Sequence, residues 1–388
     1  MEKIFNLDKN IVDHLNFYLD NSVSPVRQNI KNLSNHYQRR ESLYNKLGLT
    51  PSLLSKSRIL EIAPGSGFNS LYTYSQNPKY FELVEPNLTA CKDIKNLLFK
   101  KKNSKKNLKL NSIKIENFKP AIKYDIVLCE CWIGSLKNEI EILKTFQNLL
   151  VKNGILVITF QPGIGMFANT LRKLISFKII NRNDNINTKV EKLSKAFSSH
   201  LKKLKHMSRF KRDWIIDVLI NPATIGSYLS PETIFKALNK FEPLSTYPSF
   251  EDGWRWYKSL IKKEKTKIYL KDYYSNYLNF TDAAKKEKLI NDSIGLKIDN
   301  EIFKFYNKIL NYENSKLSYQ TLIPKILKDL RKLYKALKDF NIENFNNMIL
   351  ETIDILGSKK VNIVKIAKLQ YLSQIFGREL CYISLKKK

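Results

Sequence analysis

The chain has 388 residues with 67 basic and 36 acidic side chains, a formal net charge of +31, and it is long enough for a sizeable core and more than one domain. This charge indicates either an anionic partner, such as RNA, a phosphorylated sugar or a membrane surface, or only the shared abundance of Lys, Asn and Ile that an AT-rich genome produces. The sequence shows no signal peptide and no apolar run long enough to span a bilayer, which argues against a secreted or transmembrane protein and favours a cytoplasmic one.

Residues 1–56 precede the first core strand and are expected to form a mostly helical cap, with a break at residues 21–25. The part nearest to the core, residues 27–44, mixes cations with aromatic side chains and includes His36 and Arg40. One interpretation of this composition is an amphipathic helix that packs on the edge of a sheet.

The most informative segment joins a predicted strand at residues 59–62 to a tight turn and a helix. The turn, Ala63-Pro64-Gly65-Ser66-Gly67, carries two glycines, and the next predicted strand, residues 81–84, ends at Glu85 and Pro86. Glycines let backbone N–H groups approach a ligand closely, and an acid at the end of the second strand can hold the two hydroxyls of a ribose. The segment therefore predicts a nucleoside-containing cofactor.

The spacing within the turn indicates which cofactor to expect. A dinucleotide site would carry Gly-x-Gly-x-x-Gly, whereas this chain has an acid, Glu61, two positions before a small residue and then two glycines. This order resembles motif I of the class I S-adenosylmethionine-dependent methyltransferases. The resemblance implies S-adenosyl-L-methionine as the cofactor, with Glu61 at its amino-acid end, the glycine turn beneath it and Glu85 on its ribose. Ala63 stands where the family has its first glycine, and Pro64 partly offsets this departure by stiffening the turn.

The same resemblance gives roles to the neighbouring segments. Segments before the first strand often cap the cofactor in this fold, so we expect this segment to contact cofactor or substrate, with Tyr37 and Arg40 as candidate substrate-binding residues. A helix at residues 88–99 leads to an alternating strand at residues 108–115, which ends at Glu116-Asn117-Phe118. In the family an acid at this point accepts a hydrogen bond from the adenine amino group, and an apolar neighbour packs against the ring.

The fourth predicted strand, residues 124–129, is a continuous apolar run that is typical of a parallel sheet covered on both faces. Glu130 follows it and is the best-placed carboxylate for acceptor binding or proton removal, with a bond to backbone or cofactor as the alternative. Trp132 is placed to stabilise the bound sulfonium or to line the acceptor slot, although a tryptophan here is also an ordinary packing residue. The complete set of predicted cofactor-binding residues is Glu61, Ala63, Pro64, Gly65, Gly67, Glu85, Pro86, Glu116, Asn117, Phe118, Glu130 and Trp132.

Cys129 and Cys131 lie at the end of this strand, where alternate side chains point to opposite faces. Neither a disulfide nor a pair of zinc ligands fits this spacing. Cys91 and Cys381 do not add a recognisable pattern of disulfides or metal ligands. We therefore expect a reducing environment and no metal site.

A helix at residues 139–150 and a fifth strand at residues 155–160 continue the alternation of strands and helices. Such an alternation implies right-handed crossovers and a site at the carboxyl ends of the strands. The expected fold class is α/β, a Rossmann-like class I methyltransferase sheet that is mostly parallel with its last strand antiparallel.

Residues 163–229 are assigned as a helical insertion after the fifth strand, because the next clear helix start, at Ser230, comes much later. Between residues 171 and 212 thirteen basic side chains stand against two acidic ones. This balance favours either a lid that selects an acidic acceptor or a solvated helix face. His206 and Arg209 lie in the insertion and are candidate substrate-binding residues.

Beyond the insertion, the helix opened by Ser230 and two predicted strands, residues 241–247 and 254–260, would complete the core. Trp254 is a further candidate for substrate binding. Together with the polar and aromatic residues of the insertion, this region resembles a group of bacterial methyltransferases of undefined substrate, loosely associated with surface-polysaccharide genes. That resemblance covers residues from about 25 to 260.

Residues 261–388 carry apolar residues at helical spacing, most clearly at residues 323–337, 342–356 and 361–385. A helical C-terminal region is expected, which packs on the core or serves docking or dimerisation. The expected division of the chain is residues 1–56 as an N-terminal helical cap, 57–162 as the cofactor-binding core, 163–229 as a helical insertion that acts as a lid, 230–260 as the last helix and two strands of the core, and 261–388 as the helical C-terminal region.

These patterns predict a methyltransferase acting on an oxygen of a small-molecule or saccharide-linked acceptor, including anionic ones. His206 and His36 are candidate bases besides Glu130, since histidine titrates near neutrality, and each also suits a purely structural role. The alternatives are an RNA methyltransferase, which would bind nucleic acid through the basic insertion and the C-terminal helices, and an inactive cofactor-binding scaffold. The acids at the three positions where the family has them, Glu61, Glu85 and Glu116, argue against the scaffold. The fourth strand lacks the Asn/Asp-Pro-Pro-aromatic signature of enzymes that methylate exocyclic amines, which disfavours amino-group methylation of DNA.

Overall fold

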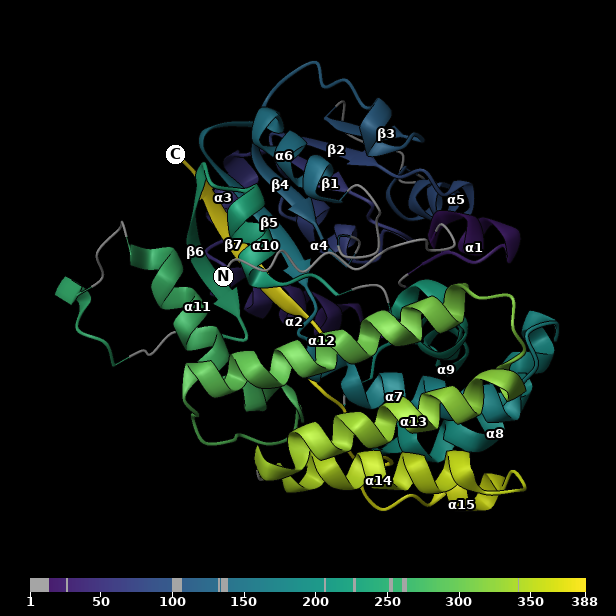
Figure 1. Ribbon diagram of the computed structural model, residues 1–388. Coiled ribbons are helices and arrows are strands. Elements are labelled where there is room, and N and C mark those ends of the chain that lie inside the picture. Colours follow the sequence, from purple (N-terminus) through teal and green to yellow (C-terminus); the bar gives the residue numbers. More distant parts are fainter. Residues whose placement is uncertain are drawn as a thin grey trace.

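The computed structural model describes residues 14–25, 27–99, 107–131, 133, 139–205, 207–225, 228–250, 254–259, 264–340 and 342–388. A seven-stranded sheet in the order β3-β2-β1-β4-β5-β7-β6 occupies the upper part of the view in Figure 1. Six strands run parallel, and β7 runs antiparallel to its neighbours β5 and β6. The predicted fold class, a mostly parallel Rossmann-like sheet of the class I methyltransferase type with its last strand antiparallel, is confirmed. The strands are β1 (Arg58–Ile62), β2 (Tyr80–Val84), β3 (Leu108–Asn111), β4 (Tyr124–Cys129), β5 (Leu150–Phe160), β6 (Phe241–Tyr247) and β7 (Cys381–Lys387).

Both faces of the sheet are covered, which explains the uninterrupted apolar runs of its central strands. On one face Ile59 belongs to an apolar cluster with Tyr44 of α2. On the other face Leu60 belongs to a cluster with Phe146 of α6. The helices near the sheet are α2 (Leu33–Lys46), α3 (Pro51–Lys56), α4 (Ser70–Ser75), α5 (Leu88–Ile94), α6 (Glu139–Leu149) and α10 (Pro231–Ala237), and α1 (His14–Asp20) precedes them.

Several local predictions are confirmed. The helix expected at residues 88–99 is α5 continued by the π-helix η1 (Lys95–Phe99). The Ser230 side chain caps α10 by accepting a hydrogen bond from the backbone N–H of Thr233 at 3.2 Å. The third strand is shorter than expected, because β3 ends at Asn111, and after an irregular stretch at residues 112–114 a 3-10 turn follows, η2 (Ile115–Asn117).

The strand predicted at residues 254–260 is wrong. In its described part, residues 254–259, the chain forms a turn and a short 3-10 helix, η5 (Tyr257–Ser259). The missing strand is β7, which comes from the C-terminus and lies between β5 and β6 (Figure 1). The helical pattern predicted at residues 361–385 is accordingly wrong beyond α15 (Ile363–Ala367).

The reason for this error lies in the burial of β7. Cys381, Ile383, Ser384 and Leu385 are all buried, because β7 is paired on both edges and covered on both faces. A short run without alternation does not distinguish a buried strand from a helix.

The insertion and the C-terminal region form one helical body. Its centre is α7 (Gly163–Ile179), in which every residue from 163 to 177 is buried. The amphipathic stripe predicted at residues 323–337 is confirmed in α13, which buries Ile326, Leu330 and Leu333. No described helix has the length and apolar character needed to cross a membrane. The other helices of this body are α8 (Ile186–Lys203), α9 (Lys211–Trp214), α11 (Lys265–Ser275), α12 (Asp292–Asn314), α13 (Tyr319–Leu337) and α14 (Glu343–Gly357).

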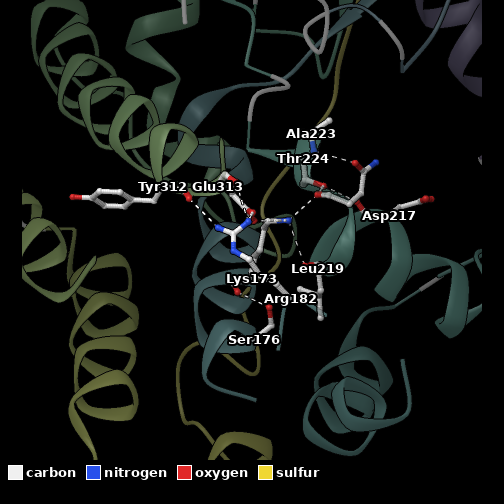
Figure 2. Close-up of polar contacts among 10 residues, drawn as sticks. Lys173, Ser176, Arg182, Asp217, Leu219, Ala223, Thr224, Tyr312 and Glu313 are labelled. Atoms are coloured by element: carbon white, nitrogen blue, oxygen red, sulfur yellow. Dashed lines mark hydrogen bonds and ion pairs between the residues drawn. The ribbon is translucent and has the colours of Figure 1, made fainter. Parts of the chain in front are cut away.

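Some basic side chains of the insertion point into this body instead of toward solvent. Figure 2 shows Lys173 directed at Glu313, with Arg182 beside it. The Lys173 ammonium lies 3.3 Å from Oε1 of Glu313 and donates to the Asn221 carbonyl at 2.7 Å. Arg172 is fully buried and also donates to backbone carbonyls. The insertion is therefore not a uniformly solvated basic face.

Candidate functional site

The turn between β1 and α4 has backbone conformations that suit glycine. Gly65 and Gly67 have φ angles of 58° and 78°, and a Cβ on Gly67 would lie 2.8 Å from Cγ1 of Ile94. Side chains at these two positions would therefore be strained. Ala63 also has a left-handed φ of 53°. Backbone strain at a non-glycine residue is frequent in functional turns.

The acid at the end of β2 is tied to this turn. Oε2 of Glu85 accepts a hydrogen bond from the N–H of Gly65, and Oε1 accepts one from the N–H of Asn87, both at 2.8 Å. Burial raises the pKa of Glu85 to about 7, against the lowering effect of these two donors. Glu85 thus holds the glycine turn against the start of α5, and each oxygen retains a lone pair for a further donor.

A strap formed by residues 22–25 and 27–29 crosses the glycine turn. The Pro25 carbonyl accepts a hydrogen bond from the N–H of Ser66 at 3.0 Å. Gln28 pairs with Arg209 of the insertion in an antiparallel bridge. The strap therefore connects the glycine turn to the helical insertion and covers part of the predicted cofactor seat.

Two buried carboxylates and one guanidinium meet at the carboxyl ends of β1 and β4. Nη2 of Arg40 donates to Oε1 of Glu130 at 2.6 Å, and the Tyr44 hydroxyl donates to the same oxygen at 2.9 Å. Burial, with the charge of Glu130 adding to it, raises the pKa of Glu61 to about 8. Oε2 of Glu61, Oε2 of Glu130 and Nε of Arg40 are buried without a hydrogen-bond partner among the residues that the structure describes. Unpartnered polar atoms of this kind need an explanation, and a polar ligand supplies one.

Cys131, directly after Glu130, also has a left-handed backbone, with a φ of 60°. Its N–H donates to Oγ1 of Thr159 at 2.7 Å. Burial raises the pKa of the Cys131 thiol to about 12, with the charge of Glu130 adding to this effect and those of Arg40 and Arg209 opposing it. The thiol is therefore protonated near neutral pH, which argues against a nucleophilic role.

The C-terminal part of the chain reaches the same edge of the sheet. Tyr382 of β7 is the register partner of Thr159, and burial raises the pKa of its hydroxyl, with Cys131 and Glu130 adding to the effect. Glu379 accepts a hydrogen bond from Nδ2 of Asn169 at 2.6 Å. Residues from the first and last segments of the chain thus border one site.

The predicted substrate-binding residues are only partly brought together. Arg40 lies in the cluster with Glu130, and Arg209 lies against the strap and forms an ion pair with Asp217. Tyr37 is half-buried and packs on Tyr72, with 5.9 Å between ring centroids. Trp254 is 94% exposed.

Trp132 and His206 lie outside the described residues. Nε2 of His36 donates to the Phe68 carbonyl across 2.9 Å, and burial lowers the pKa of His36 below 6.5. This histidine therefore holds α2 against the glycine turn. Of the predicted adenine-binding residues 116–118, the first two are exposed and Phe118 is half-buried.

Three residues at this edge, Tyr44, Glu379 and Tyr382, are not among the predicted site residues. Tyr44 lies four positions after Arg40 on one helix, so the i, i+4 spacing was an available signal. Tyr382 and Glu379 carry no local signal, because they reach the site only through the position of β7 in the sheet.

No protein-family model matches the chain, and no curated protein sequence matches it. Similar solved structures include PKMT2 from Rickettsia typhi in complex with AdoHcy, at 20% identity and a TM-score of 0.36, covering 59% of this chain and 47% of that one. The CcbJ methyltransferase from Streptomyces caelestis matches at 15% identity and a TM-score of 0.28, covering 34% and 55%. An S-adenosylmethionine-dependent methyltransferase from Mesorhizobium loti matches at 11% identity and a TM-score of 0.26, covering 29% and 50%. The chain spans about half the length of these structures, and its fold assignment rests on its own strand order.

Proposed function

We propose that the chain is an S-adenosyl-L-methionine-dependent methyltransferase that acts on an oxygen of a small-molecule or saccharide-linked acceptor. One observation carries the proposal. Arg40, Glu61 and Glu130 are buried beside a glycine turn, and each has a charged or polar atom without a partner in the described part of the chain.

The residues at this edge fit the cofactor. Oε2 of Glu61 suits an α-ammonium group, and Nε of Arg40 suits a carboxylate, so the two match the two charges of an amino-acid end. Glu85 keeps lone pairs for ribose hydroxyls beside the glycine turn. Because these groups are buried, each bond to a ligand would form at low local dielectric and be correspondingly strong.

The bound cofactor supplies an electrophilic methyl group, which an acceptor takes in an in-line displacement. The chain must align the acceptor, exclude water and remove a proton. Glu130 suits the last task, because Arg40 and Tyr44 fix Oε1 while Oε2 is left for the acceptor hydroxyl. The strap, which covers the glycine turn, suits the exclusion of water.

RNA is the alternative acceptor class. Recognition of RNA through phosphates needs several exposed cations on one surface. Arg172, Lys173 and Arg182 of the insertion instead bond to carbonyl groups of the protein itself. This arrangement removes part of the expected phosphate-binding surface and favours a small acceptor.

Calorimetry with S-adenosylhomocysteine tests the cofactor half of the proposal. The wild-type chain is expected to bind, and Glu61→Gln is expected to weaken binding at least tenfold, since a hydrogen bond to a charged group contributes about 1.5–3 kcal/mol. Absence of binding to a folded wild-type protein would contradict the cofactor assignment.

Incubation with methyl-labelled cofactor and cell extract tests the transfer. Label is expected in the saccharide or small-molecule fraction, and Glu130→Gln is expected to bind cofactor while losing the transfer. Label in RNA would identify the alternative acceptor, and binding without any labelled product would favour the inactive scaffold.

A further inference from the structure

A groove of about 570 Å³ lies between α2 and the ends of β6 and β7. The hydroxyl of Ser245 in β6 donates to the Lys46 carbonyl at 2.6 Å, which fixes the end of α2 against the sheet at this point. The lining of the groove includes Gln38, Arg39, Ser42, Lys46, Tyr247 and Tyr382.

The groove and the proposed catalytic cluster lie on adjacent faces of one helix. Arg39, Ser42 and Lys46 recur at steps of three and four residues, so they share one face of α2. Arg40 and Tyr44 are buried on the neighbouring face and bond to Glu130. Helix α2 therefore contributes side chains to both the groove and the buried cluster around Glu130.

The strand order places the groove on the side of β4 away from the glycine turn. The glycine turn and Glu85 follow β1 and β2, on one side of β4, whereas β5, β7 and β6 lie on the other side. In-line displacement requires the acceptor to approach the methyl group opposite the sulfur. If the proposed cofactor lies over β2 and β1, as the proposed function requires, the acceptor must come from the side of β7 and β6. Tyr382 belongs to both places, since it lines the groove and lies near Glu130.

The lining of the groove is cationic. Arg39 and Lys46 are exposed and form no ion pair with any residue in the described part of the chain. None of the described residues that line the groove is acidic. This charge balance attracts an anion and repels a cationic acceptor.

We propose that this groove binds the methyl acceptor, and that the acceptor is a small saccharide carrying a phosphate or carboxylate group. Arg39 and Lys46 take its negative charge. Gln38 and Ser42 supply the donors and acceptors that sugar hydroxyls need, and the rings of Tyr247 and Tyr382 offer amphipathic surfaces with a polar end. Two cations are too few for the phosphate track of an RNA, which makes a single anionic sugar the better match.

Calorimetry on the protein saturated with S-adenosylhomocysteine tests the inference. The probes are glucose 6-phosphate, glucuronic acid, uncharged glucose and cationic glucosamine. We expect at least one of the two anionic probes to bind at least tenfold more tightly than glucose and glucosamine, and the comparison of the two distinguishes phosphate from carboxylate. Arg39→Gln and Lys46→Gln are each expected to weaken that binding about fivefold to tenfold. The matched control is Lys335→Gln, on the exposed face of α13, which should change nothing.

Affinity for S-adenosylhomocysteine separates this inference from the proposed function. It should be the same in wild type, Arg39→Gln and Lys46→Gln, because neither side chain belongs to the cofactor seat. Two results would overturn the groove assignment while the methyltransferase proposal stands. In the first, S-adenosylhomocysteine binds but no anionic sugar does; in the second, the affinity for the sugar is unchanged by both substitutions. Tighter binding of a single-stranded RNA oligonucleotide, weakened by the same substitutions, would overturn the saccharide in favour of RNA.

Discussion

The guanidinium of Arg40, in α2, donates a hydrogen bond across 2.6 Å to Oε1 of Glu130, which lies 90 positions later in the sequence. Both side chains are nearly fully buried, at 5% and 9% exposure. Because a buried charge without its partner is strongly destabilising, each of these residues depends on the other. The pair therefore fixes helix α2 over the end of β4.

Arg40→Met is expected to lower the free energy of unfolding by about 3–5 kcal/mol, because it leaves Glu130 buried without its cation. Urea unfolding of the purified variant measures this. Arg39→Met is the matched control, since Arg39 is the next residue of the same helix and is exposed, and its effect should stay within about 0.5 kcal/mol. Equal losses in the two variants would mean that the buried pair contributes nothing specific.

Glu85→Ala is expected to weaken binding of S-adenosylhomocysteine at least tenfold, because a charged acceptor contributes about 1.5–3 kcal/mol. Glu85→Gln retains the size of the side chain and separates lost charge from a collapsed turn, since Glu85 also bonds to Gly65. Glu141→Ala, on the exposed side of α6, is the control. An unchanged affinity of Glu85→Ala in calorimetry would contradict the placement of the ribose.

Stability is expected to decrease as pH rises from about 5 to 9. Burial raises the pKa of Glu61 to about 8 and, despite donated hydrogen bonds, the pKa of Glu85 and Asp299 to about 7. An unfolded carboxyl group has a pKa of about 4, so in this window the folded chain binds more protons than the unfolded chain. Unfolding free energy then falls with increasing pH.

Urea midpoints measured across this range check the direction of the effect. Asp299→Asn removes one of the three groups and should flatten the pH dependence. Glu301→Gln on the same helix, where the carboxylate forms an exposed ion pair with Lys304, should leave the slope unchanged. A stability that rises steadily from pH 5 to pH 9 would contradict the raised pKa values of these buried acids.

Lys173→Met is expected to destabilise the protein by about 3–5 kcal/mol, because Glu313 would remain buried opposite an apolar side chain (Figure 2). Lys195→Met is the matched control in the same insertion. Its ion pair with Glu191 is exposed to solvent and contributes little to stability. Comparable losses in the two variants would show that burial of Lys173 has no energetic consequence.

The sequence by itself determined the features that depend on neighbouring residues. Hydrophobic runs predicted strands β1, β2, β4 and β5, since a buried parallel strand is apolar along its length. The glycine spacing predicted the turn at residues 63–67, because only a few residue types tolerate its left-handed angles. The serine and proline at residues 230 and 231 predicted the start of α10 for the same local reason.

Only the tertiary structure decided the features that join distant segments. β7 pairs with a strand more than 200 positions earlier, and no local pattern distinguished its buried residues from a helix. The partner of Arg40 and the inward direction of Lys173 depend on how the helices pack. The sequence pattern of an amphipathic helix is the same whether its basic residue faces solvent or a buried carboxylate. The physical reason is that hydrogen bonds and ion pairs between remote segments form only when the chain folds. The sequence around one partner therefore does not indicate which residue the other partner is.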